Sequence, residues 1–232
     1  MTNGRNHLLA SLSTSDFALL EPNLKSVTLG LRKQLEKPNK RIEAVYFPES
    51  GFASVVAVQP SGKEVEVGLI GREGMTGLPI VLGDHRSPHA TYIQAAGTGE
   101  CIPATELRKA IQTSQSLRDS FLKYVQAFGV QTTHTAISNA QARMDIRLAR
   151  WLLMAHDRIG EEVLALTHDF LSLMLAVRRP GVTTALNALR KDGLISYRRG
   201  KITVLDRKGL ERTAGYAYGI PEAEYRRLIG NG

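Results

Sequence analysis

The sequence has too little cysteine for the covalent and metal-based devices that stabilise or activate many small domains. Cys101 is the only cysteine in 232 residues, so neither a disulfide nor a cysteine-built metal or iron–sulfur site can form within one chain. No apolar run reaches the roughly 20 residues that a membrane-spanning helix needs. Residues 1–15 also lack the continuous apolar stretch of a signal peptide. We therefore expect a protein of the reducing cytoplasm with no membrane partner.

Negative charge is scarce in one part of the chain. The net charge is +8, and residues 143–212 contain 14 Lys and Arg against 8 Asp and Glu. Residues 1–142 are nearly balanced, with 14 against 12. A surface charge that serves only solubility is more evenly spread, so this concentration favours a polyanionic partner for the C-terminal part.

Residues 167–205 have the pattern of a winged helix-turn-helix. Thr167 is a good helix cap, and the residues after it place one apolar face at helical spacing. After a short turn, a second helix is bounded by Pro180 in its first turn and Gly193 at its end. Two short β-rich runs then enclose a basic turn at residues 198–201. The order helix, turn, helix and basic hairpin predicts this motif.

Cations lie at the two places where such a motif contacts DNA. Arg178 and Arg179 open the second helix, and the hairpin tip carries three more. An ordinary αα-hairpin beside a β-hairpin is the alternative, but it has no reason to place cations there. The residues that we predict to contact DNA are Thr167, His168, Arg178, Arg179, Thr183, Thr184, Arg198, Arg199 and Lys201.

The first hundred residues are mostly of β type. A short helical pattern at residues 8–20 precedes brief runs separated by Pro and Gly, at 27–29, 42–47, 52–58, 64–69, 91–95 and 100–102. This spacing predicts a small antiparallel roll or barrel. A Gly-rich segment at 71–77 interrupts it, and glycine at this density permits either tight turns or close approach to a ligand. The residue pattern leaves both explanations open.

Helices dominate after Pro103. A capping box at residues 116–119 predicts a helix that runs to about Ser138. Four of its apolar residues follow a spacing that suits a two-helix contact in a homodimer. They are Leu117, Phe121, Tyr124 and Phe128. Packing of this face on the β-roll is the alternative.

A break and a second helix follow. Residues 138–140 are the expected hinge, and residues 144–159 have a helical apolar pattern. Arg143, Arg147 and Arg150 fall on one face of this helix, which we expect to be solvated or to form salt bridges.

Taken in chain order, these features resemble the family typified by the cyclic-AMP receptor protein and the fumarate–nitrate regulator. The matching stretches are Pro48-Glu49-Ser50-Gly51, the Gly-rich segment, residues 147–153 and residues 194–202. The resemblance implies an α+β chain with three parts. These are a cyclic-nucleotide-binding-type sensor β-roll at 1–115, a dimerisation helix and hinge at 116–140, and a winged helix-turn-helix domain at 141–232. It also implies a regulator without enzymatic activity, whose partners are double-stranded DNA, a second copy of the chain and RNA polymerase.

The sensor departs from the cyclic-AMP-binding members of this family. Those members hold the ribose and cyclic phosphate with a Gly-Glu-Leu step and a later Arg-Ser pair. The matching positions here are Gly77-Leu78-Pro79 and Pro88-His89, with Arg86-Ser87 two residues earlier. A buried phosphate without a partner is costly, so we expect neither cyclic AMP nor another cofactor. An unidentified effector or a sensor that has lost ligand binding both fit; the candidate effector-loop residues are Gly74, Gly77, Leu78, Arg86, Ser87 and His89.

The base-reading positions differ as well. The family's readers fall on Arg179, Pro180 and Thr184, and only the arginine is retained. We therefore expect a palindromic operator whose sequence differs from that of the cyclic-AMP receptor. A metal-dependent β-barrel enzyme would need clustered ligands, whereas His7, His85 and His89 lie in scattered loops. A nucleotide-binding regulatory subunit that acts through protein contacts is the remaining alternative, although it would not need the basic wing.

Overall fold

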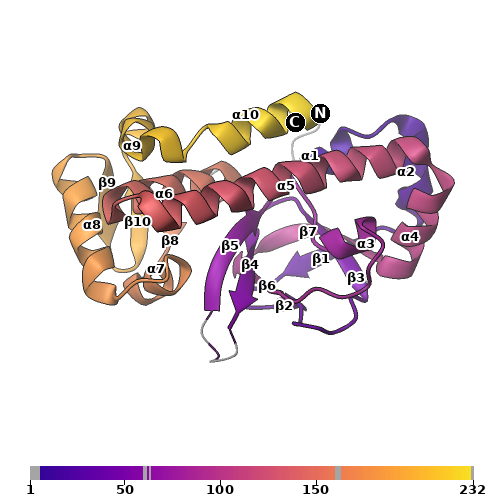
Figure 1. The fold of residues 1–232 in the computed structure, drawn as a ribbon, viewed down its shortest axis with the longest axis horizontal. Coiled ribbons are helices and arrows are strands. Elements are labelled where there is room, and N and C mark those ends of the chain that lie inside the picture. Colours follow the sequence, from indigo (N-terminus) through magenta and orange to yellow (C-terminus); the bar gives the residue numbers. More distant parts are fainter. Residues whose placement is uncertain (1–5, 60–61, 63, 160–162, 231–232) are drawn as a thin grey trace.

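One long helix joins a β-rich N-terminal half to a helical C-terminal half (Figure 1). The computed structural model describes residues 6–59, 62, 64–159 and 163–230. Its helices are α1 His7–Ala10, α2 Thr14–Leu20, α3 Leu78–Val81, α4 Ala104–Thr113, α5 Gln115–Gln141, α6 Met144–Ile159, α7 His168–Met174, α8 Arg179–Lys191, α9 Arg207–Ala214 and α10 Ile220–Ile229. Its strands are β1 Lys25–Leu29, β2 Gln34–Glu36, β3 Ala44–Pro48, β4 Phe52–Val58, β5 Glu64–Ile70, β6 Ala90–Ala95, β7 Gly97–Pro103, β8 Val163–Ala165, β9 Ile195–Arg198 and β10 Lys201–Val204. The predicted α+β architecture is confirmed.

The N-terminal half is a roll of two antiparallel sheets. Their strand orders are β1-β7-β3 and β2-β6-β4-β5. The six predicted strands are all present, whereas β2 was not predicted, because Gln34–Glu36 has no apolar run to reveal it. β4 is buried along most of its length, since its outer side is covered by the C-terminal half. Phe52 on this strand makes an edge-on contact with Trp151 of α6, with ring centroids 6.2 Å apart.

Helix α5 begins earlier and ends later than its sequence pattern predicts. Ser114 caps it by accepting a hydrogen bond from the Leu117 N–H at 3.2 Å, so the capping box at 116–119 is not used. The helix continues through Gln141, and the break before α6 lies at Ala142 and Arg143. The expected hinge at 138–140 is therefore wrong. Ser138 is still helical because its carbonyl accepts the Ala142 N–H at 3.0 Å.

The apolar face of α5 packs inside the protomer and is not left free to meet the α5 helix of a second copy. Its members are Leu117, Phe121, Tyr124 and Phe128, all of them buried against the β-roll and its flanking helices. The prediction that these four residues form the dimer seam is wrong. Helical spacing reveals an apolar stripe but not the surface that covers it.

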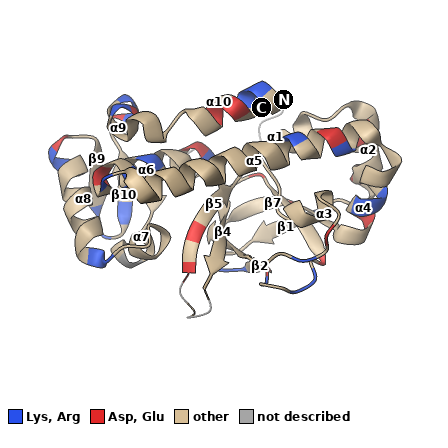
Figure 2. Ribbon diagram, viewed as in Figure 1, with Lys and Arg blue, Asp and Glu red and all other residues tan. Residues whose placement is uncertain are grey.

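A second, uncharged face of α5 is left exposed. Residues 124–142 contain no Lys, Arg, Asp or Glu, and the middle of α5 carries no charged position in Figure 2. The exposed residues recur at intervals of three and four, at Gln126, Gly129, Thr133, Ala136 and Ala140. Such small, uncharged side chains allow two helices to approach closely, so this face has the character of a helix-packing surface.

The C-terminal helix α10 lies along α5 on the side away from the sheets (Figure 1). Tyr225 connects it to the Gly-rich loop, because its hydroxyl donates to the Glu73 carbonyl at 2.8 Å. The first turn is capped by Glu222, whose carboxylate accepts the Gly219 N–H at 2.8 Å. This helix was not predicted from the sequence.

Candidate nucleic-acid interface

Helices α7 and α8 form the predicted helix-turn-helix. Thr167 caps α7, and its hydroxyl accepts the Phe170 N–H at 3.2 Å. The turn after α7 includes Ala176 in the left-handed region at φ +51°. Arg178 is extended, and Pro180 lies in the first turn of α8, where its missing N–H has no intrahelical partner to lose.

The apolar face of α8 is buried in the core of the domain and holds the helix in place, while the opposite face is exposed. Val182, Ala185, Leu186 and Leu189 are buried in a core shared with α6, α7 and the wing. Arg178 and Arg179 are both exposed at the start of α8. A recognition helix presents its N-terminal end to base edges, so this placement suits DNA contact.

Strands β9 and β10 form the wing. Arg198 is paired directly with Lys201, which leaves a two-residue turn at Arg199 and Gly200. Both turn residues have positive φ, +50° and +76°, as the tightest hairpins require. Arg198, Arg199 and Lys201 are exposed, and cationic positions mark both α8 and the wing in Figure 2. A third strand, β8, pairs with β10 and was not predicted.

The remaining predicted DNA contacts are partly engaged within the domain. His168 Nδ1 lies 2.9 Å from the Thr183 hydroxyl, and its ring packs on Tyr197 with centroids 4.7 Å apart. This contact braces α7 against both α8 and the wing. The Thr184 hydroxyl donates to the Pro180 carbonyl at 3.0 Å while the side chain stays exposed. Contact of these residues with DNA stays a prediction.

Arg143, Arg147 and Arg150 were expected to form one solvated or salt-bridged face, but the structure places Arg143 just before α6 and engages the other two with the neighbouring segments. Arg150 is buried and donates to the Ala217 carbonyl at 2.9 Å and to the Thr135 hydroxyl at 3.0 Å. Arg147 donates to the Leu175 carbonyl at the end of α7. These contacts tie α6 to α5, α7 and the segment before α10. Only Arg143 is exposed, beside Asp145 at 3.4 Å.

The candidate effector-loop residues do not come together around one space. Gly74 packs beneath the Tyr124 ring, and Leu78 begins α3. Arg86 is exposed, whereas Ser87 is buried and its hydroxyl accepts the His89 N–H at 3.0 Å.

Gly77 is already engaged by a carboxylate that the sequence analysis missed. Its N–H donates to Glu36 Oε1 at 2.6 Å, and the Thr91 hydroxyl donates to Glu36 Oε2 at 3.2 Å. Burial raises the pKa of Glu36, while these hydrogen bonds oppose the rise. No local signal in the sequence could have revealed it, because β2 has no apolar run and lysines lie three residues before and one residue after Glu36.

Two further geometric observations bear on function. No group of three or more His, Cys, Asp or Glu side chains within the described residues is arranged to hold a metal ion. None of the described helices is both long and apolar enough to cross a bilayer.

Comparison with known proteins agrees with this geometry. Residues 146–213 match the family model of the Crp-like helix-turn-helix domain. The transcriptional regulator SdrP of Thermus thermophilus is 29% identical over 169 residues, which cover 71% of this chain and 80% of that protein. The global nitrogen regulator of Nostoc sp. is 25% identical over 186 residues, covering 76% and 83% respectively.

Solved structures share the complete architecture. FixK2 from Bradyrhizobium japonicum superposes with a TM-score of 0.72 at 14% identity, covering 84% of this chain and 99% of its own. A Crp/Fnr-family transcriptional regulator from Eubacterium rectale gives a TM-score of 0.69 at 20% identity, covering 89% and 97%. The fold and the interface define a helix-turn-helix DNA-binding protein with a cyclic-nucleotide-binding-type sensor fold. Residues 146–213 are thus a Crp-like helix-turn-helix domain, and the chain as a whole has the fold of the solved Crp/Fnr-family regulator.

Proposed function

We propose that this protein binds a palindromic operator as a homodimer, with α8 in the major groove and the wing on the adjacent backbone. The observation that carries the proposal is the pairing of two cationic sites in one domain. Arg178 and Arg179 are exposed at the start of α8, and Arg198, Arg199 and Lys201 are exposed around the wing turn. Arg179 is the candidate reader, because its guanidinium can donate two hydrogen bonds to guanine O6 and N7.

The proposed dimer contact is the exposed, uncharged face of α5. One recognition helix buries too little surface for a specific site, so a second copy is needed. A two-fold axis along α5 would present two α8 helices to inverted half-sites centred about one helical turn, or a multiple, apart. The small residues of this face, such as Gly129 and Ala136, support a close helix pair.

The sensor is proposed to respond to something other than cyclic AMP. The Glu36 carboxylate binds the Gly77 N–H, close to the position where a cyclic phosphate would need donors. The Gly77 N–H is therefore already taken by an internal acceptor and is not free to bind a phosphate, which supports the expectation drawn from the missing Gly-Glu-Leu step.

RNA polymerase is the proposed protein partner, because a protein that regulates transcription at an operator acts on the polymerase there. The cytoplasm is the proposed place of action, because the DNA lies there. No catalytic activity is proposed, because the relatives are named as a transcriptional regulator and a global nitrogen regulator.

Selection of duplexes from a random pool by the purified protein tests the function directly. The expected product is an inverted repeat whose half-sites are protected in a footprint. Failure to enrich any duplex, together with capture of a nucleotide, would instead support a regulatory subunit that acts through protein contacts.

A further inference from the structure

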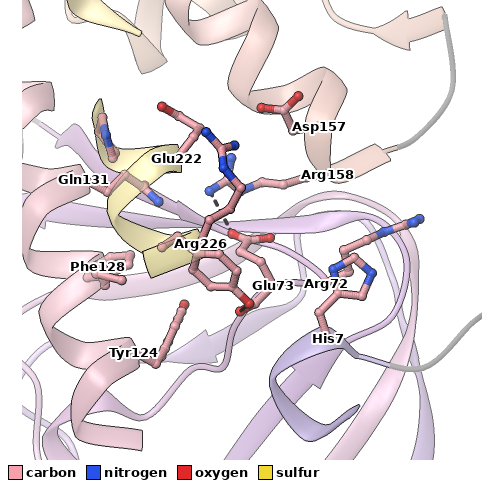
Figure 3. Close-up of a pocket in the computed structure, with 13 residues that line it drawn as sticks. His7, Arg72, Glu73, Tyr124, Phe128, Gln131, Asp157, Arg158, Glu222 and Arg226 are labelled. Carbon is pink, nitrogen blue, oxygen red and sulfur yellow. Dashed lines mark hydrogen bonds and ion pairs between the residues drawn. The ribbon is translucent and has the colours of Figure 1, made fainter. Parts of the chain in front are cut away.

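A cavity of about 170 Å³ lies between α5, α10, the C-terminal end of α6 and the loop that follows β5 (Figure 3). Tyr124 and Phe128 line it from α5, and Arg158 reaches it from α6. Arg72 comes from the loop and Tyr225 from α10. None of the candidate effector-loop residues lines this space. It is therefore a different place from the one that the family resemblance indicates.

Two glycines of the Gly-rich segment give the cavity its shape. A Cβ on Gly71 would lie 2.6 Å from Cγ of Arg158, and a Cβ on Gly74 would lie 1.9 Å from the Tyr124 hydroxyl. Both distances are too short for any other residue without rearrangement. The glycines thus let α5 and α6 approach the loop closely. The sequence left open whether this segment is rich in glycine for backbone geometry or for a ligand, and these contacts favour backbone geometry.

The carboxylates at the cavity are already engaged. Glu73 forms an ion pair with Arg158 at 2.7 Å, drawn as a dashed line in Figure 3. Asp157 pairs with Arg207 at 2.7 Å, and Glu222 caps α10. Glu73 and Asp157 are thus paired with arginines, whereas the charge of Glu222 acts on Arg158 without a direct ion pair among the described residues.

Several hydrogen-bond donors in the cavity lining have no acceptor among the described residues. Within the described residues, neither Arg72 nor Arg226 forms an ion pair, although both line the cavity. Among the residues that the structure describes, the Nε atoms of Arg72 and Arg158 and the hydroxyl of Tyr124 have no hydrogen-bond partner, and all three atoms are buried. Arg158 and Tyr124 are only 7% and 2% exposed. Buried donors of this kind are costly unless an acceptor satisfies them.

We propose that this cavity binds a small aromatic carboxylate. The carboxylate would accept hydrogen bonds from the Arg72 and Arg158 guanidinium groups and from the Tyr124 hydroxyl, and Arg226 would add positive charge beside it. The ring would pack against Phe128 and Tyr225. A planar, bidentate acceptor suits guanidinium donors, and the aromatic lining suits a flat apolar body. The bound carboxylate would contact the Gly-rich loop that follows β5, helix α5 and helix α6 at the same time. That the cavity binds this ligand is independent of the proposed function. That the ligand acts as an effector of DNA binding rests on the proposed function.

Calorimetric titration of the full-length protein with benzoate, and with neutral benzamide as the matched ligand, tests the proposal. We expect one benzoate per chain and at least tenfold weaker binding of benzamide. Arg72→Ala should weaken benzoate binding about tenfold, and Tyr124→Phe, which keeps the shape of the side chain, about threefold. No detectable benzoate binding, or equal affinity for the two ligands, would overturn the proposal. Tighter binding of phenyl phosphate than of benzoate would also overturn it.

Neighbouring arginines on α10 provide the matched control variants. Both are exposed, but Arg226 lines the cavity, whereas Arg227 does not line it and pairs with Glu224 at 2.7 Å. Arg226→Ala should weaken benzoate binding and Arg227→Ala should not; equal effects would show attraction by bulk charge and not by a site. Operator binding is measured separately on the unliganded protein, so a failed titration beside intact DNA binding rejects the cavity proposal alone. Loss of operator selection beside intact benzoate binding rejects the proposed function alone.

Discussion

The Trp151 indole N–H donates to the Glu66 carboxylate at 2.6 Å, across the contact between the β-roll and α6. Both side chains are buried, and Ser54 donates to the second Glu66 oxygen. Met174 of α7 lies against the same Ser54 hydroxyl at 3.8 Å. A single carboxyl on β5 therefore connects the sensor sheet to the first two helices of the C-terminal half.

This carboxyl should make stability depend on pH. Burial raises the pKa of Glu66 to about 7 from an ordinary value of 4.5, against the opposing effect of its hydrogen bonds. Between those values the folded chain keeps a proton that the unfolded chain releases, so the free energy of unfolding should fall as pH rises, by about 3 kcal/mol in all.

Glu66→Gln removes this titration. Its melting temperature should fall less between pH 5 and 8 than that of wild type, measured beside the exposed control Glu43→Gln. Parallel curves for Glu66→Gln and wild type would contradict the assignment.

Substitutions on α8 and on the wing should affect DNA binding differently, because we expect α8 to read base pairs and the wing to contact the phosphate backbone. Arg179→Ala should cost about 1–3 kcal/mol at the selected operator and relax discrimination at one base pair per half-site. Arg199→Ala and Lys201→Ala should weaken operator and scrambled duplex alike, and each should lower the slope of log affinity against log salt by about one. Titrations of all three variants over a salt series decide this. If Arg179→Ala weakens both duplexes equally, Arg179 contacts phosphate and does not read sequence.

The exposed face of α5 should hold the dimer together. Thr133→Arg and Ala136→Arg place like charges on both sides of the proposed two-fold axis, so each should yield monomers in sedimentation. Gln112→Arg adds the same charge to the exposed side of α4 and serves as control. A dimer that survives both α5 substitutions would place the contact elsewhere.

The opposite face of α5 should govern stability and not assembly. Phe121 is fully buried and packs on Phe47 with ring centroids 6.2 Å apart. Phe121→Ala should lower the free energy of unfolding by about 3–5 kcal/mol through lost burial and a residual cavity. Chemical denaturation would measure this beside Leu31→Ala, which removes a side chain that is 62% exposed. Equal stability of the two variants would contradict the packing described for α5.

Local chemistry made several parts predictable from the sequence alone. The Thr167 cap, the Pro180 first turn and the Gly193 helix end follow from backbone hydrogen bonding and allowed dihedral angles, which act over a few residues. The strands of the β-roll were recognisable for the same reason, since their apolar runs and turn signals are local. The concentration of positive charge in residues 143–212 needed only counting. Together these determined the fold class and the DNA-binding motif.

Contacts between distant segments were decided only by the tertiary structure. The spacing of Leu117 and Phe128 predicts a dimer seam, whereas in the structure the β-roll and its helices cover them, because periodicity defines a face and not its partner. The sequence predicts a solvated or salt-bridged Arg150, whereas in the structure Ala217 and Thr135, 67 and 15 residues away, accept its hydrogen bonds. The cavity at Arg72 and Arg158 likewise exists because α10 returns to α5 over the Gly-rich loop. Side chains far apart in the chain meet only when the folded core fixes their distance, and no local pattern encodes that distance.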